Sequence, residues 1–274
     1  MPALSWVNKS IEKINSNDDD KDLFTCFSMA SRWTGKDRLN IDTAELEQAK
    51  SIKEGFNPLH FSADQATRIL LLLSSYKNDN EKFAKKLDKI LSVADIPEKV
   101  AIYSSLPFLP DPDKFSGLAA DGLRTNITEV FDSIVLNNPY PMEYLPENAW
   151  NQMVLKAIFT NRPLYKIYGF DKRKNKALAN MLSDFAHERW AAGRGITPEL
   201  WRATGPFLDE YLFTDIEKII ASENIYETEA ACLACTESHF DETHKLLAKY
   251  PGIREDIARG KLNWDILGKK LELV

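Results

Sequence analysis

The spacing of apolar residues constrains the fold of this chain more than any other feature of its sequence. In almost every segment of ten or more residues, apolar positions recur at intervals of three and four, and almost no segment alternates apolar with polar residues. The first spacing places apolar side chains on one face of an α-helix, whereas alternation is typical of a strand. Ser62, a good N-cap residue, precedes the thick apolar face of residues 69–73. The sequence therefore predicts an all-α protein.

The predicted helices are unevenly spaced. Their expected starts near residues 62, 97, 115 and 147 exclude a strict repeat, yet their order resembles antiparallel helix pairs stacked in an α-solenoid. No linker rich in Gly or Ser divides the chain. We therefore expect a short, irregular α-solenoid of the HEAT or armadillo kind, forming a single domain over residues 1–274 with N-terminal helices within residues 1–55. Single helices are expected at residues 115–136, 147–160, 172–192, 198–208 and 227–249.

Composition excludes several functions. The 274 residues include 35 Lys or Arg and 41 Asp or Glu, a net charge of −6, so the chain lacks the basic field of proteins held on nucleic acid. Its longest aliphatic run, residues 69–73, is far shorter than the roughly 20 residues that a membrane helix needs. The N-terminus has no basic segment followed by an apolar one, as a secretory signal would. We expect no nucleic acid, no membrane span and a cytoplasmic location.

Four residues near the C-terminus have the side chains of a zinc site. Cys232 and Cys235 are followed by His239 and His244, but zinc fingers place about 12 residues between the second Cys and the first His. On a continuous helix His244 also points away from the other three side chains. Buried thiols explain the two cysteines better, because free Cys is commonly buried. We therefore expect no metal and no cofactor.

Residues 170–202 form a basic segment within an acidic chain. They hold seven Lys or Arg and four Asp or Glu, a local charge of +3 that leaves −9 for the remainder. A local basic region attracts anions. We therefore expect a small anionic metabolite to bind at this basic segment.

One helix of the basic segment carries a polar stripe. At about 100° per residue, the stripe comprises Asn180, Asp184, His187, Ala191 and Arg194, and apolar residues occupy the opposite side. An imidazole one turn from a carboxylate is suited to acid/base work near neutral pH, or to anion binding beside an arginine. A solvated helix face produces the same pattern. Both interpretations stay open at this point.

Arg189 lies in the middle of the apolar side of the same helix. An arginine there must extend to the surface or meet a carboxylate. The candidate partners are Glu143, Asp171 and Glu188. Such a pair would either fix helix packing or contact a ligand.

Gly193 and Gly195 separate this helix from the next one. Thr197 is expected to be an N-cap, with Pro198 at the first helical position and Glu199 in the first turn. No strand precedes the glycines and no Lys-Ser or Lys-Thr follows them, so a phosphate-binding loop is not indicated. A helix boundary explains these residue types.

Several long strings of the chain resemble the EboA-domain family. They are residues 122–126 (GLRTN), 129–159 (EVFDSIVLNNPYPMEYLPENAWNQMVLKAIF), 163–175 (PLYKIYGFDKRKN), 186–194 (AHERWAAGR), 197–202 (TPELWR) and 205–207 (GPF). The resemblance covers roughly residues 60–250. It implies a bacterial accessory protein encoded beside a UbiA-type prenyltransferase, a TatD-like metal hydrolase, a dehydroquinate-synthase-like enzyme and a sugar-phosphate-isomerase-like protein. Such clusters are linked to secondary metabolites, including export or processing of precursors, and their proteins are the partners that the resemblance implies.

Polar residues of these strings and of the helix stripe are the candidate site residues. The predicted ligand-binding residues are Arg124, Asn126, Glu143, Asn151, Lys156, Arg173, Asn175, Asp184, Arg189, Arg194 and Arg202. His187 and Glu188 are the predicted catalytic residues if the protein is an enzyme.

These residues support three hypotheses. In the first, the protein binds a small polar or anionic metabolite, or a partner enzyme, in a groove lined by its central helices, with His187 and Arg194 pointing into it. In the second, it is an enzyme on a metabolite precursor with His187 as general acid or base, oriented by Asp184 or Glu188. In the third, it is a non-catalytic scaffold whose motifs hold together its own fold or a cluster partner.

Overall fold

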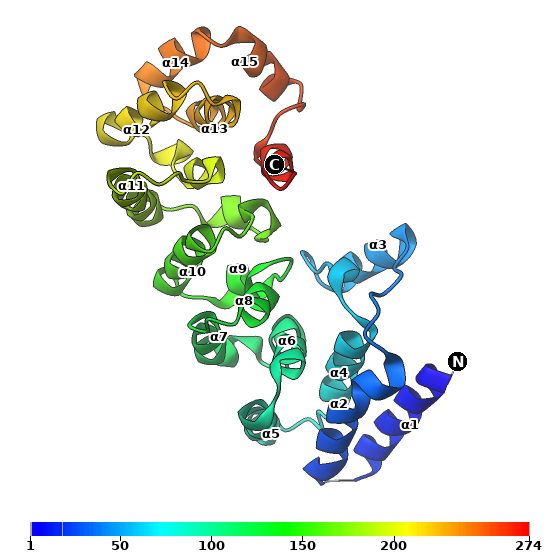
Figure 1. Cartoon of the computed structure of the whole chain (residues 1–274). Coiled ribbons are helices and arrows are strands. Elements are labelled where there is room, and N and C mark those ends of the chain that lie inside the picture. The colour runs from blue at the N-terminus through cyan, green and yellow to red at the C-terminus, as the bar shows by residue number, and fades with distance from the viewer. Residues whose placement is uncertain (1, 18, 274) are drawn as a thin grey trace. The chain divides into compact units, whose positions relative to one another are not determined.

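The computed structural model describes residues 2–17 and 19–273, and its elements within these ranges are α-helices and 3-10 turns joined by loops (Figure 1). The only β-type pairing among the described residues is an isolated antiparallel bridge between Arg38 and Ser62. The prediction of an all-α protein is therefore confirmed. No described helix is both long and apolar enough to cross a membrane.

The chain divides into two compact units, residues 1–146 (unit 1) and residues 147–274 (unit 2). The helices of each unit pack mainly on one another, and each unit is described by itself. The single domain and the α-solenoid arrangement stay predictions.

Unit 1 is built around helix α4. The α-helices of unit 1 are α1 (Pro2–Ser16), α2 (Asp20–Thr34), α3 (Thr43–Ile52), α4 (Ala63–Ser74), α5 (Asn80–Val93), α6 (Ile96–Ser104), α7 (Ser116–Leu123), α8 (Thr128–Val135) and α9 (Tyr140–Tyr144), with 3-10 turns η1 (Pro58–His60), η2 (Leu106–Phe108) and η3 (Pro112–Phe115). α4 packs against α1, α2 and α6. Its buried Arg68 pairs with Asp64 at 2.5 Å and donates to the carbonyl oxygen of Phe27 on α2 at 3.1 Å. The hydrogen bond to Phe27 joins α4 to α2 inside the unit, and Asp64 balances the charge of Arg68.

The predicted long helix at residues 115–136 is instead a 3-10 turn followed by α7 and α8. The hydroxyl of Thr125 accepts the backbone N–H of Ile127 at 3.1 Å, which gives the backbone an alternative to the helical bond. α7 packs against α8, and a Cβ at Gly122 would lie 2.6 Å from side-chain atoms of Ile134 and Tyr103. A side chain at residue 122 would therefore crowd the packing of α7 on α8. The prediction of one long helix is wrong, because α7 ends at Leu123 and α8 begins at Thr128.

Unit 2 is built around helix α13. The α-helices of unit 2 are α10 (Glu147–Phe159), α11 (Lys176–Ala191), α12 (Glu210–Ile220), α13 (Ile225–Thr236), α14 (Asp241–Ala248), α15 (Pro251–Ala258) and α16 (Trp264–Leu271), with 3-10 turns η4 (Leu164–Lys166), η5 (Phe170–Arg173), η6 (Pro198–Ala203) and η7 (Gly205–Phe207). α13 packs against α12, α14, α16 and η6. The C-terminal helix α16 also packs against η4 and η6, so segments far apart in sequence meet inside this unit.

The predicted helix at residues 227–249 is interrupted, because the hydroxyl of Ser238 accepts the backbone N–H of Phe240 at 3.0 Å and forms a turn between α13 and α14. Cys232 and Cys235 lie buried on α13 as free thiols. Burial raises the pKa of both thiols to about 12, so they stay protonated at neutral pH. Within the described residues, no group of three or more His, Cys, Asp or Glu is arranged to hold a metal ion.

The predicted helix at residues 198–208 is replaced by the turns η6 and η7. Pro206 cannot donate a helical hydrogen bond, and a Cβ at Gly205 would lie 2.9 Å from the carbonyl oxygen of Ala234. The chain therefore changes direction here and rests directly on α13. As a result Glu199, expected in an ordinary first helical turn, is 3% exposed.

Candidate functional site

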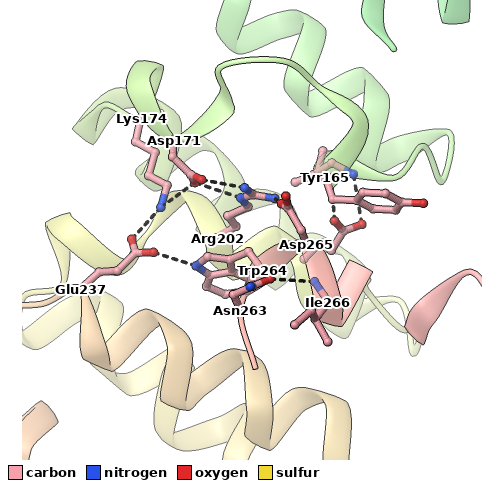
Figure 2. A network of polar contacts seen from close by, with 11 residues as sticks. Tyr165, Asp171, Lys174, Arg202, Glu237, Asn263, Trp264, Asp265 and Ile266 are labelled. Carbon is pink, nitrogen blue, oxygen red and sulfur yellow. Dashed lines mark hydrogen bonds and ion pairs between the residues drawn. The ribbon is translucent and has the colours of Figure 1, made fainter. Parts of the chain in front are cut away.

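Arg202, a predicted ligand contact, is held between two carboxylates of unit 2. Its Nε and Nη2 atoms donate to Asp171 at 2.9 and 2.6 Å, and its Nη1 atom lies 2.9 Å from Asp265 at the start of α16 (Figure 2). The guanidinium also stacks 5.5 Å from the ring centre of Phe170. Both planar edges of the guanidinium are therefore occupied from within the chain.

Lys174 extends this cluster toward α13 (Figure 2). Its ammonium lies 3.0 Å from Asp171 and 2.6 Å from Glu237, and Glu237 accepts the indole N–H of Trp264 at 2.7 Å. Burial alone would raise the pKa of Asp171, but Arg202 and Lys174 hold it below its usual range. We define these residues as the Arg202 network, which consists of Asp171, Lys174, Arg202, Glu237, Trp264 and Asp265.

The Arg202 network pairs cations of the basic segment with acids from elsewhere in the chain. Lys176, another cation of the segment, is also paired with an acid, because its ammonium lies 2.5 Å from Asp209. The acids Asp209, Glu237 and Asp265 all lie outside the basic segment, in the acidic remainder of the chain. Much of the local positive charge is thus neutralised when unit 2 folds, which weakens the argument for an anionic ligand at this segment.

Three more predicted site residues join α10 to the start of α11. The buried side-chain amide of Asn151 exchanges hydrogen bonds of 2.9 and 3.2 Å with that of Asn175. Asn175 also caps α11 by accepting the backbone N–H of Leu178 at 2.8 Å. The Arg173 guanidinium lies 4.9 Å from the ring centre of Trp150, and burial lowers the pKa of Arg173. These contacts give the three residues a structural role.

His187 is oriented by a carboxylate from another helix. Its Nε2 atom lies 2.6 Å from Asp215 on α12, and the second oxygen of Asp215 accepts the Ser183 hydroxyl at 2.6 Å. Asp215 is almost fully buried, whereas 41% of the His187 side chain is exposed. The predicted partners, Asp184 and Glu188, are both exposed, so that prediction is wrong. The true partner lies 28 residues away, where helical spacing cannot reveal it.

Aromatic rings pack beside His187. Its ring centre lies 5.7 Å from that of Trp190, which stacks in turn on Trp201 at 5.9 Å. The ammonium of Lys218 lies 3.8 Å from the ring centre of Trp190, a close cation–π contact between α11 and α12. Tyr211 on α12 meets the imidazole edge-on at 6.0 Å and is 53% exposed.

Arg189 does not meet a carboxylate. Its Nε and Nη2 atoms both donate to the carbonyl oxygen of Gly195, at 3.2 and 3.0 Å. Gly193 has a φ of +66°, a value that favours glycine, and it lets the loop fold back toward α11. The predicted partners Glu143, Asp171 and Glu188 are therefore wrong, and Arg189 stabilises the loop that precedes η6.

The other predicted residues are near the surface of their units. In unit 1, Arg124 pairs with the exposed Asp121, Glu143 pairs with Lys53 at 2.5 Å, and Asn126 is exposed. In unit 2, Arg194 is exposed, and Lys156 is half-buried with its pKa lowered by burial.

A cleft of about 310 Å³ lies in unit 2, and none of the predicted site residues lines it. Its size is at the lower end of the range of small-molecule sites, about 300 to 1,000 Å³. It is lined by Asn161, Arg162, Pro163, Thr197, Pro198, Glu199, Gly268, Leu271 and Glu272. Two pockets in unit 1, of about 20 and 10 Å³, have room for little more than a water molecule each. Neither His187 nor Arg194 lines the cleft.

Glu199 provides a buried carboxyl group in the wall of the cleft. Its two oxygens accept the backbone N–H groups of Tyr165 at 2.9 Å and Leu164 at 3.1 Å. Burial raises the pKa of Glu199 above its usual value despite these two hydrogen bonds. A Cβ at Gly268 of α16 would lie 2.5 Å from the Tyr165 ring and 2.6 Å from a Glu199 oxygen. α16 therefore reaches the cleft only because residue 268 has no side chain.

Glu272 lies at the rim of the cleft. Its carboxylate pairs with Lys166 at 2.6 Å and accepts the hydroxyl of Tyr165. Partial burial would raise the pKa of Glu272, but Lys166 and Tyr165 lower it below its usual value. Glu272, Glu199 and Arg162 were not among the predicted site residues. An acid after Pro198 is ordinary at a helix start, and no sequence pattern indicates that α16 packs beside Glu199.

Comparison with known proteins gives one match. The sequence model of a family described as "Metabolite traffic protein EboA" matches residues 1–205. No curated protein and no solved structure matched the chain. The match includes the first 55 residues and ends at residue 205, earlier than the expected limit near residue 250. Gly268, Leu271 and Glu272 of the cleft lie beyond the matched residues. Because the match covers most of the chain, this protein belongs to the EboA family.

Proposed function

We propose that this protein is a cytoplasmic accessory protein of a bacterial secondary-metabolite pathway and binds a small polar metabolite in the cleft of unit 2. The observation that carries the proposal is the cleft itself, about 310 Å³ with the buried carboxyl group of Glu199 in its wall. A site with a few fixed polar groups among apolar walls is typical of small-molecule recognition. The family description, metabolite traffic, agrees with such a role.

The cleft supports binding better than the Arg202 network does. In the network the guanidinium already contacts two carboxylates, so a ligand would have to displace an internal ion pair. In the cleft, Thr197 is half-buried and forms no side-chain cap on η6. Pro163, Pro198 and Leu271 provide apolar walls.

Filling the cleft tests the proposal. Thr197→Trp places an indole in the cleft at little structural cost, because the threonine makes no capping hydrogen bond. Ala192→Trp is the matched control, because residue 192 is exposed in the same unit and does not line the cleft. In a thermal-shift screen of pathway intermediates, a bound compound should raise the Tm of the wild type and of Ala192→Trp but not of Thr197→Trp. An equal rise in all three proteins would place binding elsewhere and contradict the proposal.

The second candidate is an enzyme with His187 as general acid or base. It is favoured by the 2.6 Å contact to Asp215, which fixes the ring while leaving part of it exposed. Glu188, the other predicted catalytic residue, is exposed and has no such support. His187→Gln should then abolish turnover of a pathway precursor while leaving Tm nearly unchanged, whereas a large loss of Tm would indicate a structural residue.

The scaffold hypothesis is favoured by the internal use of Asn151, Asn175 and Arg202. It predicts that cluster proteins bind this chain and that Thr197→Trp leaves pathway output unchanged. Loss of output in Thr197→Trp with retained Tm would contradict a pure scaffold.

A further inference from the structure

The charge of the cleft differs from that of the basic segment. Among the described residues that line it, Arg162 is the one cation, and Glu199 and Glu272 contribute two carboxyl groups, of which Glu272 also pairs with Lys166. An anion bound there would lie near these carboxyl groups, and like charges repel. A ligand that donates hydrogen bonds would instead find two groups that accept them.

Glu199 has capacity for such donors. An ionised carboxylate offers about four lone-pair positions, and the N–H groups of Leu164 and Tyr165 use one position on each oxygen. Glu199 is only 3% exposed, so a hydroxyl or ammonium donor can use the remaining positions only if it reaches the wall of the cleft. Burial raises the pKa of Glu199, and a cationic donor close by would favour its ionised form. The charged groups around Glu199 are Arg202, which lowers its pKa, and Glu272, which raises it.

Glu272 provides acceptors at the rim. Its side chain is 39% exposed, and its pKa stays below the usual value because Lys166 and the Tyr165 hydroxyl compensate the effect of burial. It is therefore ionised at neutral pH. Pro163 and Pro198 also line the cleft and provide apolar contacts for the C–H groups of a saturated ring.

We infer that the cleft takes a small hydroxyl-rich ligand, neutral or carrying an amine, rather than an anion. This inference rests on the proposed function and makes it more specific. It reverses the expectation from the basic segment, because Lys174, Lys176 and Arg202 of that segment are paired with acids and the cleft is lined mainly by carboxyl and apolar groups.

Three probes that share one ring separate the possibilities. Glucose is neutral, glucosamine is cationic at mildly acidic pH, and glucose 6-phosphate is anionic. Binding to the full-length protein is measured by saturation-transfer NMR, with dissociation constants from titration at low ionic strength. We expect glucosamine to bind at least as tightly as glucose, and glucose 6-phosphate to bind at least about tenfold more weakly than glucose.

Two matched variants test the role of charge. Glu272→Gln keeps an acceptor but removes the charge, and should weaken glucosamine binding about three- to tenfold while changing glucose binding less than about twofold. Glu255→Gln on α15 is the control, because Glu255 is an exposed partner of Arg259 and does not line the cleft. It should change neither value. An equal loss in both variants, or none in Glu272→Gln, contradicts the inference.

The remaining outcomes separate this inference from the proposed function. If glucose 6-phosphate binds as tightly as glucose and Thr197→Trp abolishes that binding, the ligand class is wrong and the cleft is still the binding site. If neither glucose nor glucosamine binds the wild type, the inference is overturned, and the pathway-intermediate screen decides the proposed function independently. If Thr197→Trp retains glucosamine binding, glucosamine binds outside the cleft and the inference is overturned, and the pathway-intermediate screen still decides the proposed function.

Discussion

The Arg202 network and the cleft use the same sequence string in opposite ways. Both contain a residue of η6, which is Arg202 in the network and Glu199 in the cleft. Both also contain a residue of the C-terminal segment, which is Asp265 on α16 in the network and Glu272, just after α16, in the cleft. In the network every charged group faces an opposite charge within the chain (Figure 2). In the cleft, the carboxyl groups of Glu199 and Glu272 also have partners within the chain, but they line an open space of about 310 Å³. Residue type alone therefore does not identify a site, because the fold decides which polar groups line a cleft.

The largest expected effect comes from breaking the network. Arg202→Met keeps much of the side-chain volume over Phe170 but removes the cation that Asp171 and Asp265 share, and it leaves Asp171 with Lys174 alone. We expect a loss of about 3 kcal/mol in the free energy of unfolding measured with urea, at the lower end for a broken buried pair because both carboxylates are half-exposed. Arg194→Ala is the control and should change stability by less than about 0.5 kcal/mol, since Arg194 is exposed. Equal losses would show that the network does not stabilise unit 2.

The next effect concerns the contact of α16 with the cleft. Gly268→Ala puts a Cβ 2.5 Å from the Tyr165 ring and 2.6 Å from Glu199, so we expect a loss of about 2 kcal/mol and a lower Tm. Gly252→Ala on α15 is the matched control, because nothing lies within 4 Å of its Cβ and alanine favours a helix. It should leave Tm unchanged or raise it. A neutral Gly268→Ala would mean that α16 does not approach Glu199 as described.

A smaller effect is expected at His187. Asp215→Asn removes the charge that faces the imidazole and disturbs the Ser183 hydrogen bond, so we expect a loss of about 1 kcal/mol in the free energy of unfolding. The partly exposed imidazole limits the loss. Urea unfolding of the wild type and the variant measures this loss. Unchanged stability would show that the contact between Asp215 and His187 does not stabilise unit 2.

The smallest expected effect is a pH dependence of opposite sign in the two regions. The pKa of Glu199 is raised, so the folded state binds its proton more tightly, and this group contributes stability that declines as pH rises from about 4.5 to the folded pKa. The stability of the wild type relative to Glu199→Gln should therefore increase as pH is lowered through that window. The pKa of Asp171 is lowered, so its contribution is present above 3.8 and is lost as pH falls further. Urea unfolding at several pH values checks both, and a pH-independent difference for Glu199→Gln would contradict its raised pKa.

The helical class could be predicted because periodicity is a local property. Helix boundaries were less predictable where a hydroxyl such as that of Thr125 or Ser238 forms a turn, or where Gly122 or Gly205 allows close packing. These features depend on neighbours from other helices. The sequence pattern around them is still that of a continuous helix.

The candidate site was less predictable than the fold. Helix geometry placed His187 on a polar face, but its partner Asp215 comes from another helix. The basic segment looked unpaired because its acids, Asp209, Glu237 and Asp265, lie elsewhere in the sequence. The cleft itself forms only when α16 packs on η4 and η6, which no local pattern indicates.

Binding of the ligand in the cleft can be measured at the lining residues themselves by methyl NMR. With the threonine and leucine methyl groups labelled, glucosamine should shift the signals of Thr197 and Leu271, which line the cleft, and leave that of the exposed Thr214 on α12 unchanged. Shifts confined to the first two residues are the predicted result. Shifts at Thr214 with none at Thr197 and Leu271 would contradict binding in the cleft.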